Sequence, residues 1–150
     1  MGISIYAEER DQKLEELESL TAKLELQERF FDMFLHQCPF VIWLKDYTHD
    51  EGRMLFISDK YTDIFGVSEK DYVGRLDKDV WPQTVAQYFR KQDLEVIETG
   101  EDVYRVEPTP LADDAAWKRC HTLKFPIRDR EGRVVAVGGI AWPVGDGTIR

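Results

Sequence analysis

Several features that particular functional classes depend on are scarce in this sequence. Only two of the 150 residues are cysteines, Cys38 and Cys120, which is too few for a disulfide framework and fits buried thiols in a reducing compartment. The three histidines show no paired spacing and there is no Cys-x-x-Cys motif, so we predict that the chain has no metal site. No nucleophile elbow or glycine-rich phosphate loop is present. We therefore predict no catalytic residues and no enzymatic activity.

Positive charge and long apolar runs are also scarce. Twenty basic residues against 29 acidic residues give a net charge of −9. Because binding to phosphates needs a basic face, we predict no nucleic-acid partner and no membrane surface as partner. No apolar run approaches the roughly 20 residues of a membrane helix, and residues 1–10 lack the basic start and apolar block of a secretory signal. We expect a cytoplasmic protein.

The sequence does contain one long helical segment, residues 8–35. It has no glycine or proline and is rich in helix formers, and it should end near Pro39. Apolar residues recur in it at spacings of three, four and seven, and they are Leu17, Leu20, Leu24, Phe31 and Phe34. This pattern is typical of a short coiled-coil seam. We favour a homodimer through this seam, and a helix packed on its own domain is the alternative.

After Pro39 the sequence changes to short apolar and β-branched runs separated by turn signals. Strands are predicted at residues 40–44, 54–57, 102–108, 117–128 and 133–142. Short helices are predicted between the second and third strands, one capped by Ser58 or Asp59, one by Ser68, and a longer one opened by a capping box at Thr84 and running to Thr99. The fold class is therefore α+β, with a five-stranded antiparallel sheet that carries helices on one face and ends in a meander.

The order of these elements, together with specific stretches, resembles a sensory PAS domain of the bacterial signalling type over residues 36–142. The matching stretches are residues 56–61, 64–66, 68–75, 77–82, 93–100 and the last hairpin, 124–141. The resemblance implies a small internal cavity and attachment to a signalling output such as a histidine kinase or a cyclase. Residues 143–150 would form a tail or linker. Since Pro143 opposes a continuous helix there, we expect either that the sequence is a piece of a longer protein or that residues 8–35 connect to the output.

The resemblance also bears on cofactors. Flavin photoreceptors of this superfamily carry a reactive cysteine shortly after the glycine that matches Gly74, whereas this sequence has Leu76 and Asp77, so no covalent flavin adduct is expected. Haem-binding members use a histidine on or near the long helix, and residues 85–99 contain none, which argues against haem. Non-covalently bound flavin, another small organic ligand, or no ligand remains.

If the strands align with those of flavin-binding relatives, one set of side chains points into the cavity. We predict as ligand-binding residues Val41, Trp43, Tyr61, Cys120, Thr122 and Ala141. In this register Leu123 and Phe125 lie on the outer sheet face, which the N-terminal helix or a second subunit should cover. A slip of one residue would exchange the two faces. Two interpretations stay open: a pocket for a modest ligand, or a core that Trp43 fills. We identify no buried acid or base in the cavity.

Overall fold

Helix α1 (Gly2–Gln37) forms most of the first of two compact units, residues 1–34 and 35–150. The computed structural model describes residues 2–111 and 114–145, so residues 146–150 of the predicted tail lie outside the described residues. The helix begins at Gly2, and the predicted start at residue 8 is wrong, because no proline interrupts residues 2–37. It ends two residues before Pro39, as predicted. Of the described helices, none has the length and apolar composition that a bilayer span requires.

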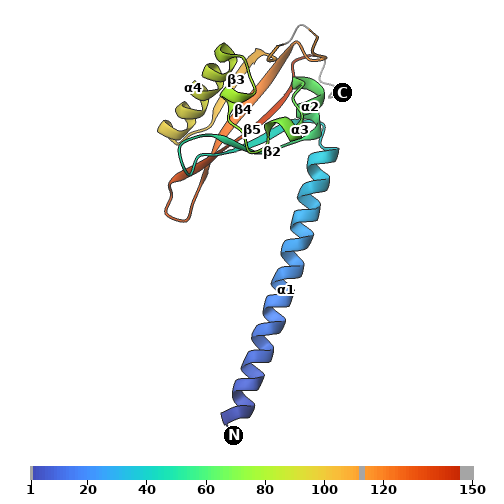
Figure 1. The fold of residues 1–150 in the computed structure, drawn as a ribbon, viewed down its shortest axis with the longest axis vertical. Coiled ribbons are helices and arrows are strands. Elements are labelled where there is room, and N and C mark those ends of the chain that lie inside the picture. Colours follow the sequence, from blue (N-terminus) through green and yellow to red (C-terminus); the bar gives the residue numbers. More distant parts are fainter. Residues whose placement is uncertain (1, 112–113, 146–150) are drawn as a thin grey trace. The chain divides into compact units, whose positions relative to one another are not determined.

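The second unit is built on an antiparallel sheet of five strands (Figure 1). The strands are β1 (Val41–Asp46), β2 (Arg53–Ile57), β3 (Val103–Pro108), β4 (Arg119–Arg128) and β5 (Val134–Pro143). Their order in the sheet is β2-β1-β5-β4-β3. The last three strands form the predicted meander, and β5 pairs with β1 in the centre. The α+β fold class is therefore confirmed.

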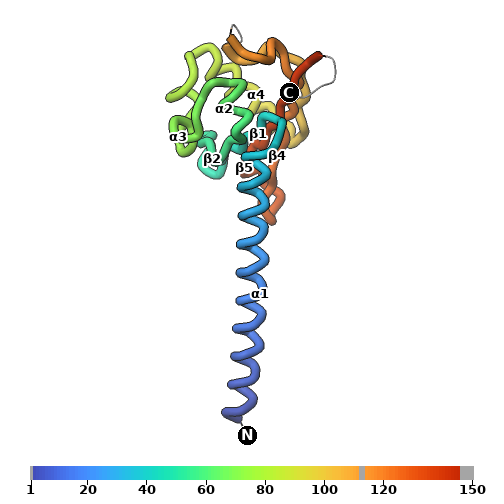
Figure 2. Tube along the Cα trace, turned by 90° about the vertical axis from the view of Figure 1, so that its right-hand side faces the viewer, coloured from blue at the N-terminus to red at the C-terminus, as the bar shows by residue number. Residues whose placement is uncertain are grey.

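Helices lie on one face of this sheet (Figures 1 and 2). They are α2 (Asp59–Phe65), α3 (Glu69–Tyr72), the short 3₁₀ helix η1 (Asp77–Asp79) and α4 (Gln83–Thr99). Ser68 caps α3 as predicted, since its side chain accepts a hydrogen bond from the Asp71 amide. The capping box predicted at Thr84 is wrong. Helix α4 begins at Gln83 after Pro82, whose φ of −53° already suits a helix start.

Ser58 precedes α2, but its side chain does not cap that helix. The Ser58 hydroxyl instead accepts a hydrogen bond from the Ile42 amide at 2.9 Å and donates one to the Phe40 carbonyl at 3.0 Å. Ser58 is fully buried. Its hydroxyl therefore joins the start of α2 to the first residues of β1, and the predicted capping role is replaced by this bridge.

Side chains alternate between a buried and a less buried face along β1 and β4. Trp43 lies on the buried face opposite Gly139 of β5. A Cβ atom on Gly139 would overlap the Trp43 indole, so only glycine leaves room for the ring there. On the other face, Phe125 covers Gly138 in the same way. The two neighbouring glycines thus admit one aromatic ring on each side of the sheet.

Candidate functional site

A small cavity lies between the buried sheet face and the helices. Its lining comes from β1, β4, α2, α4 and the end of β3, and comprises Trp43, Lys45, Tyr61, Phe65, Phe89, Gln92, Glu107, Pro110, Cys120, Thr122 and Lys124. The cavity has a volume of about 20 Å³, which is room for about one water molecule. The Trp43 indole, which packs over Gly139, is part of this lining.

All six residues predicted to bind a ligand are buried on this side of the sheet. Trp43, Tyr61, Cys120 and Thr122 line the cavity itself. Val41 and Ala141 pair across β1 and β5 and belong to the adjoining core rather than to the lining. The structure therefore brings the predicted residues together on one face, and whether they bind a ligand stays a prediction.

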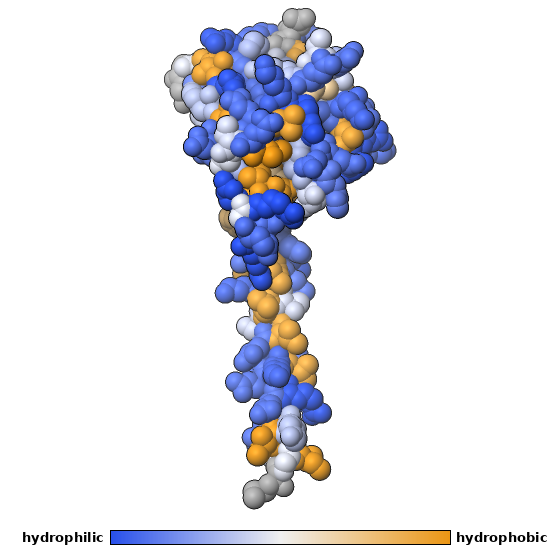
Figure 3. All heavy atoms as spheres, turned by 90° about the vertical axis from the view of Figure 1, so that its left-hand side faces the viewer, coloured by the Kyte–Doolittle hydropathy of each residue, from blue (hydrophilic) through white to orange (hydrophobic). Residues whose placement is uncertain are grey.

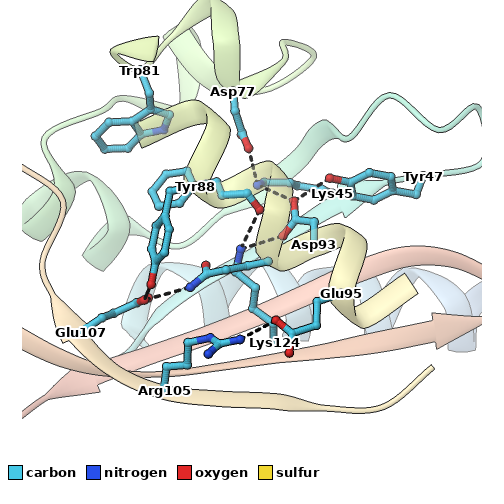
Figure 4. A network of polar contacts seen from close by, with 12 residues as sticks. Lys45, Tyr47, Asp77, Trp81, Tyr88, Asp93, Glu95, Arg105, Glu107 and Lys124 are labelled. Carbon is cyan, nitrogen blue, oxygen red and sulfur yellow. Dashed lines mark hydrogen bonds and ion pairs between the residues drawn. The ribbon is translucent and has the colours of Figure 1, made fainter. Parts of the chain in front are cut away.

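Two lysines of the lining, Lys45 and Lys124, belong to a cluster of four buried charges beside the cavity. We call it the ion cluster, and its members are Lys45, Asp77, Asp93 and Lys124 (Figure 4). The Lys45 ammonium donates to Asp77 Oδ2 at 2.6 Å and to Asp93 Oδ2 at 2.9 Å. The Lys124 ammonium donates to Asp93 Oδ1 at 2.7 Å. Asp93 therefore binds one lysine with each of its carboxylate oxygens, and the four formal charges cancel.

Hydroxyl and indole groups complete the partners of the two aspartates. The Tyr47 hydroxyl donates to Asp93 Oδ2 at 2.6 Å, and the Tyr72 hydroxyl donates to Asp77 Oδ1 at 2.5 Å. The Trp81 indole N–H in turn donates to the Tyr72 hydroxyl at 2.9 Å. Because buried charges are costly unless they are hydrogen-bonded, these donors help to hold both carboxylates in the interior.

Burial and charge oppose each other in the ion cluster. Burial disfavours the charge on Lys45, but Asp93 and Asp77 outweigh it and raise the pKa of Lys45 above its ordinary value. Burial likewise disfavours the charge on Asp93, but Lys45 and Lys124 lower the pKa of that carboxyl. Burial lowers the pKa of Lys124, and repulsion by Lys45 lowers it further, so that the attraction of Asp93 offsets only part of the decrease. Of the two lysines, Lys124 therefore holds its proton less strongly.

A second polar group lies where α4 meets the end of β3. Glu107 Oε2 accepts hydrogen bonds from the Tyr88 hydroxyl at 2.5 Å and from Gln92 Nε2 at 2.9 Å. Burial and the Glu107 carboxylate raise the pKa of Tyr88 to about 12. Gln92 is 4% exposed, and its Oε1 atom has no hydrogen-bond partner among residues 2–111 and 114–145. The cavity lining thus includes an amide oxygen to which no described residue donates.

Sequence reasoning missed the ion cluster: it identified no buried acid or base in the cavity, whereas the lining includes Lys45, Glu107 and Lys124. A signal was available, because Lys45 continues the two-residue alternation of Val41 and Trp43, and Lys124 continues that of Cys120 and Thr122. Lysines are almost never fully buried unless they are paired. The sequence does not show that Asp93 lies beside both lysines. When only the sequence is known, that rule therefore predicts that both lysines are exposed.

The arrangement of a half-open antiparallel sheet, short helices on one face and a cavity between them can be compared with known families. The family model described as the PAS fold matches residues 35–147. This chain belongs to the PAS-fold family. It is a sensory PAS domain of the kind found in signalling proteins such as histidine kinases.

Among curated relatives, the methanogenesis regulatory histidine kinase FilI of Methanothrix harundinacea is 25% identical over 144 residues, or 96% of this chain. The uncharacterized protein y4lL of Sinorhizobium fredii is 33% identical over 78 residues, or 52% of this chain. The chain spans 16% of the length of FilI and 9% of that of y4lL. This PAS domain is therefore similar to a small part of much longer proteins.

Solved structures show the same fold. VqmA bound to DPO is 26% identical with a TM-score of 0.62, and the match covers 82% of this chain and 58% of the VqmA chain. The Vibrio cholerae VqmA dimer without target DNA matches at the same identity and TM-score, over 76% of this chain and 51% of VqmA. The PAS domain of Bordetella pertussis BvgS is 22% identical with a TM-score of 0.62, over 81% and 88% of the two chains. The BvgS likeness supports the fold alone.

Proposed function

We propose that this PAS domain is a signal-sensing and dimerisation module that binds a small ligand in its cavity and acts on an output domain or partner through α1. The observation that carries the proposal is the ion cluster beside the cavity, whose two lysines belong to the cavity lining. A buried ion pair is often no more stabilising than apolar side chains of similar volume. Clusters of buried, perturbed ionisable groups beside a cavity are instead typical of functional sites.

The relatives support the same reading. VqmA, which is 26% identical to this chain, has been solved bound to DPO, so a ligand-binding protein is among the similar structures. FilI is a histidine kinase, which fits the expected output. A cyclase is the other output that we consider. Neither output is encoded in the 150 residues.

Dimerisation is supported by exposed apolar surface on α1. The seam residues Leu17, Leu20, Leu24, Phe31 and Phe34 are each at least 40% exposed, and Figure 3 shows apolar side chains along the helix. Leu26, Phe30 and Met33 add further exposed apolar surface. A single helix that exposes such a stripe is stabilised when a second helix covers it. VqmA forms a dimer, and a homodimer through the seam is our proposal here.

The outer sheet face is the second surface that a partner would cover. Tyr104, Val106 and Ile127 are between 38% and 55% exposed on β3 and β4. The rings of His121 and Trp142 stack beside Tyr104, with ring centroids 5.3 Å apart. An apolar face of this kind marks an interface. We assign it, as in the prediction from sequence, to an N-terminal helix or to the second subunit.

The test of ligand binding uses the purified chain. We expect its thermal midpoint to rise reproducibly with one class in a metabolite panel, since a ligand that binds the folded state stabilises it. Cys120→Leu, which adds volume inside the cavity, should abolish the rise. Cys38→Leu makes the same change at a buried cysteine outside the lining and should retain it. No rise with any class, or equal rises in all three proteins, contradicts the proposal.

A ligand-free interaction module is the second candidate, and the cavity of about 20 Å³ favours it. In that case Trp43 and its neighbours are simply core, and the sheet face and α1 act through contacts alone. A colourless protein with no small molecule on denaturing mass spectrometry and no thermal shift would support this candidate. The absorbance spectrum and native mass, measured together, report cofactor and oligomer in one sample.

The remaining predictions are part of the same proposal. PAS domains are generally sensory rather than catalytic, and every buried charge of the ion cluster already has an opposite partner, so we propose that the domain is not an enzyme. The net charge of −9 argues against direct nucleic-acid binding by this domain. VqmA is a DNA-binding receptor, so this is a proposal about residues 1–150 alone. Two free thiols fit the cytoplasm.

A further inference from the structure

A wide groove on the surface of the second unit lies between α4, η1 and the turn that joins β1 to β2. It has a volume of about 1090 Å³, and none of its lining residues lines the cavity. The apolar part of the groove is formed by Tyr47, Leu76, Ala86 and Leu94. A concave surface of this size that combines apolar side chains with a few polar groups is typical of a ligand-binding site.

Arg90, in the middle of α4, is held in the groove wall by two contacts. Its Nη2 atom donates to the Asp50 carbonyl at 2.8 Å, and its guanidinium carbon lies 5.3 Å from the centre of the Tyr47 ring. Neither contact neutralises the charge, and Arg90 forms no ion pair within residues 2–111 and 114–145. An arginine that is held in place but not paired is suited to a carboxylate, which its fork of N–H groups binds well.

One nitrogen of Arg90 indicates what kind of group is missing. Nη1 is buried, and no described residue accepts a hydrogen bond from it. A buried donor without an acceptor is unfavourable. Since a guanidinium can only donate, the group that completes Arg90 must be an acceptor. Protein atoms cover Nη1, so a shift of this side chain must accompany binding.

The other charges of the groove favour an anion beside Arg90. Lys78 and Lys91 are exposed and likewise form no ion pair with a residue that the structure describes. Three acids of the lining already have cationic partners, and they are Glu51, Asp77 and Glu95. Of the two acids that remain, Glu98 lies about 12 Å from Arg90 along the helix axis. Asp50 is therefore the unpaired acid of the lining next to Arg90, against three unpaired cations.

We propose that this groove is a second binding site, which takes a small organic carboxylate with an apolar chain. The carboxylate binds Arg90, and the chain packs on Leu76 and Leu94. This site is distinct from the cavity to which the proposed function assigns a ligand. Asp77 lines the groove and Lys45 lines the cavity, and the ion pair between them joins the two (Figure 4). An occupant of the groove therefore lies next to the ion cluster without entering the cavity.

Three probes test the ligand class on the full chain. They are hexanoate, which has both the charge and the chain; hexanamide, which has the same chain without the charge; and acetate, which has the charge without the chain. The dissociation constant from NMR titration should be at least tenfold lower for hexanoate than for either of the others. The amide signals of Asp50 and Leu94 should shift with hexanoate. This comparison needs no variant, so it stands even if a substitution impairs folding.

Variants then assign the contact with the carboxylate. Arg90→Gln should weaken hexanoate at least fivefold and leave hexanamide unchanged, whereas Arg90→Lys, which keeps the charge, should retain part of the preference for hexanoate. Arg133→Gln removes an exposed arginine from the turn between β4 and β5 and should bind like the wild type. Cys120→Leu alters the cavity alone and should also bind like the wild type.

Several outcomes would overturn the groove site. Hexanamide binding as tightly as hexanoate would do so, as would an unchanged affinity in Arg90→Gln. Loss of hexanoate binding in Cys120→Leu would assign this ligand to the cavity, which contradicts the groove site and supports the proposed function. Absence of hexanoate binding to the wild type also overturns the site, even if an acidic peptide binds the groove instead. A metabolite whose thermal shift depends on Cys120 would then leave the proposed function standing.

Discussion

Trp43 and Gly139 face each other across β1 and β5, and the indole occupies the space that a side chain at position 139 would need. Gly139→Ala must displace the ring, and we expect a loss of about 1–3 kcal/mol in the free energy of unfolding, which is the usual cost of overpacking. Urea denaturation measures this loss.

Two further variants separate overpacking at Gly139 from a general effect of alanine. Trp43→Leu in the Gly139→Ala background should restore part of the lost stability, because the indole is then absent. Gly145→Ala adds a methyl group where no atom lies within 4 Å, and it should change stability by less than about 0.5 kcal/mol. Equal effects at positions 139 and 145 would contradict the packing argument.

Asp93 is expected to be the most sensitive member of the ion cluster, since both lysines bind to it. Asp93→Asn leaves two buried ammonium groups without a full counter-charge, and breaking a buried pair in this way costs about 3–5 kcal/mol. Glu95→Gln is the matched control two residues along α4. Glu95 pairs with Arg105 at the surface, and removal of such an exposed pair costs at most about 1 kcal/mol. Chemical denaturation of the two variants should therefore differ clearly.

The pH dependence follows from the lowered pKa of Asp93. A carboxyl whose pKa is lower in the folded state stabilises the fold above its unfolded pKa, near 3.8, and this stabilisation is lost as the pH falls towards the folded pKa. Between pH 5 and pH 3 the wild type should therefore lose more stability than Asp93→Asn. Thermal midpoints measured in this window by circular dichroism test the difference. Parallel curves for the two proteins would show that Asp93 is not responsible.

The seam on α1 predicts a concentration-dependent dimer. Size-exclusion chromatography with light scattering should give a dimer for the wild type and a monomer for Leu24→Glu, which places a charge in the seam. Ala22→Glu introduces the same charge at an exposed position outside the seam and should remain dimeric. If Leu24→Glu behaves like the wild type, the dimer does not form through these residues.

Much of the fold was predictable from local patterns. The two-residue alternation in β1 and β4 predicted which side chains are buried, and glycine and proline signals marked the ends of most elements. The start of α4 was misplaced because Pro82 initiates the helix without a side-chain cap. The start of α1 was misplaced because residues 2–7 show only a weak helical pattern in the sequence, although in the structure they belong to the same continuous helix.

The candidate site was only partly predictable. Trp43, Cys120 and Thr122 follow from strand periodicity, whereas the pairing of Lys45 with Asp93 joins residues 48 positions apart. Neither local propensity nor spacing contains information about such a contact. The free amide oxygen of Gln92 depends in the same way on Glu107, which lies on another element. Functional polar contacts of this kind need the tertiary structure.

The compensation of charge in the ion cluster limits how the interior can evolve. The charges of the four buried residues sum to zero. A substitution that removes one charge therefore leaves an opposite charge buried without its partner, which is unfavourable. Viable descendants should therefore exchange acidic and basic members together, and homologues that lose one of the lysines should also have lost an acid. Covariation between positions on β1, β4, η1 and α4 is the trace that this constraint would leave in related sequences.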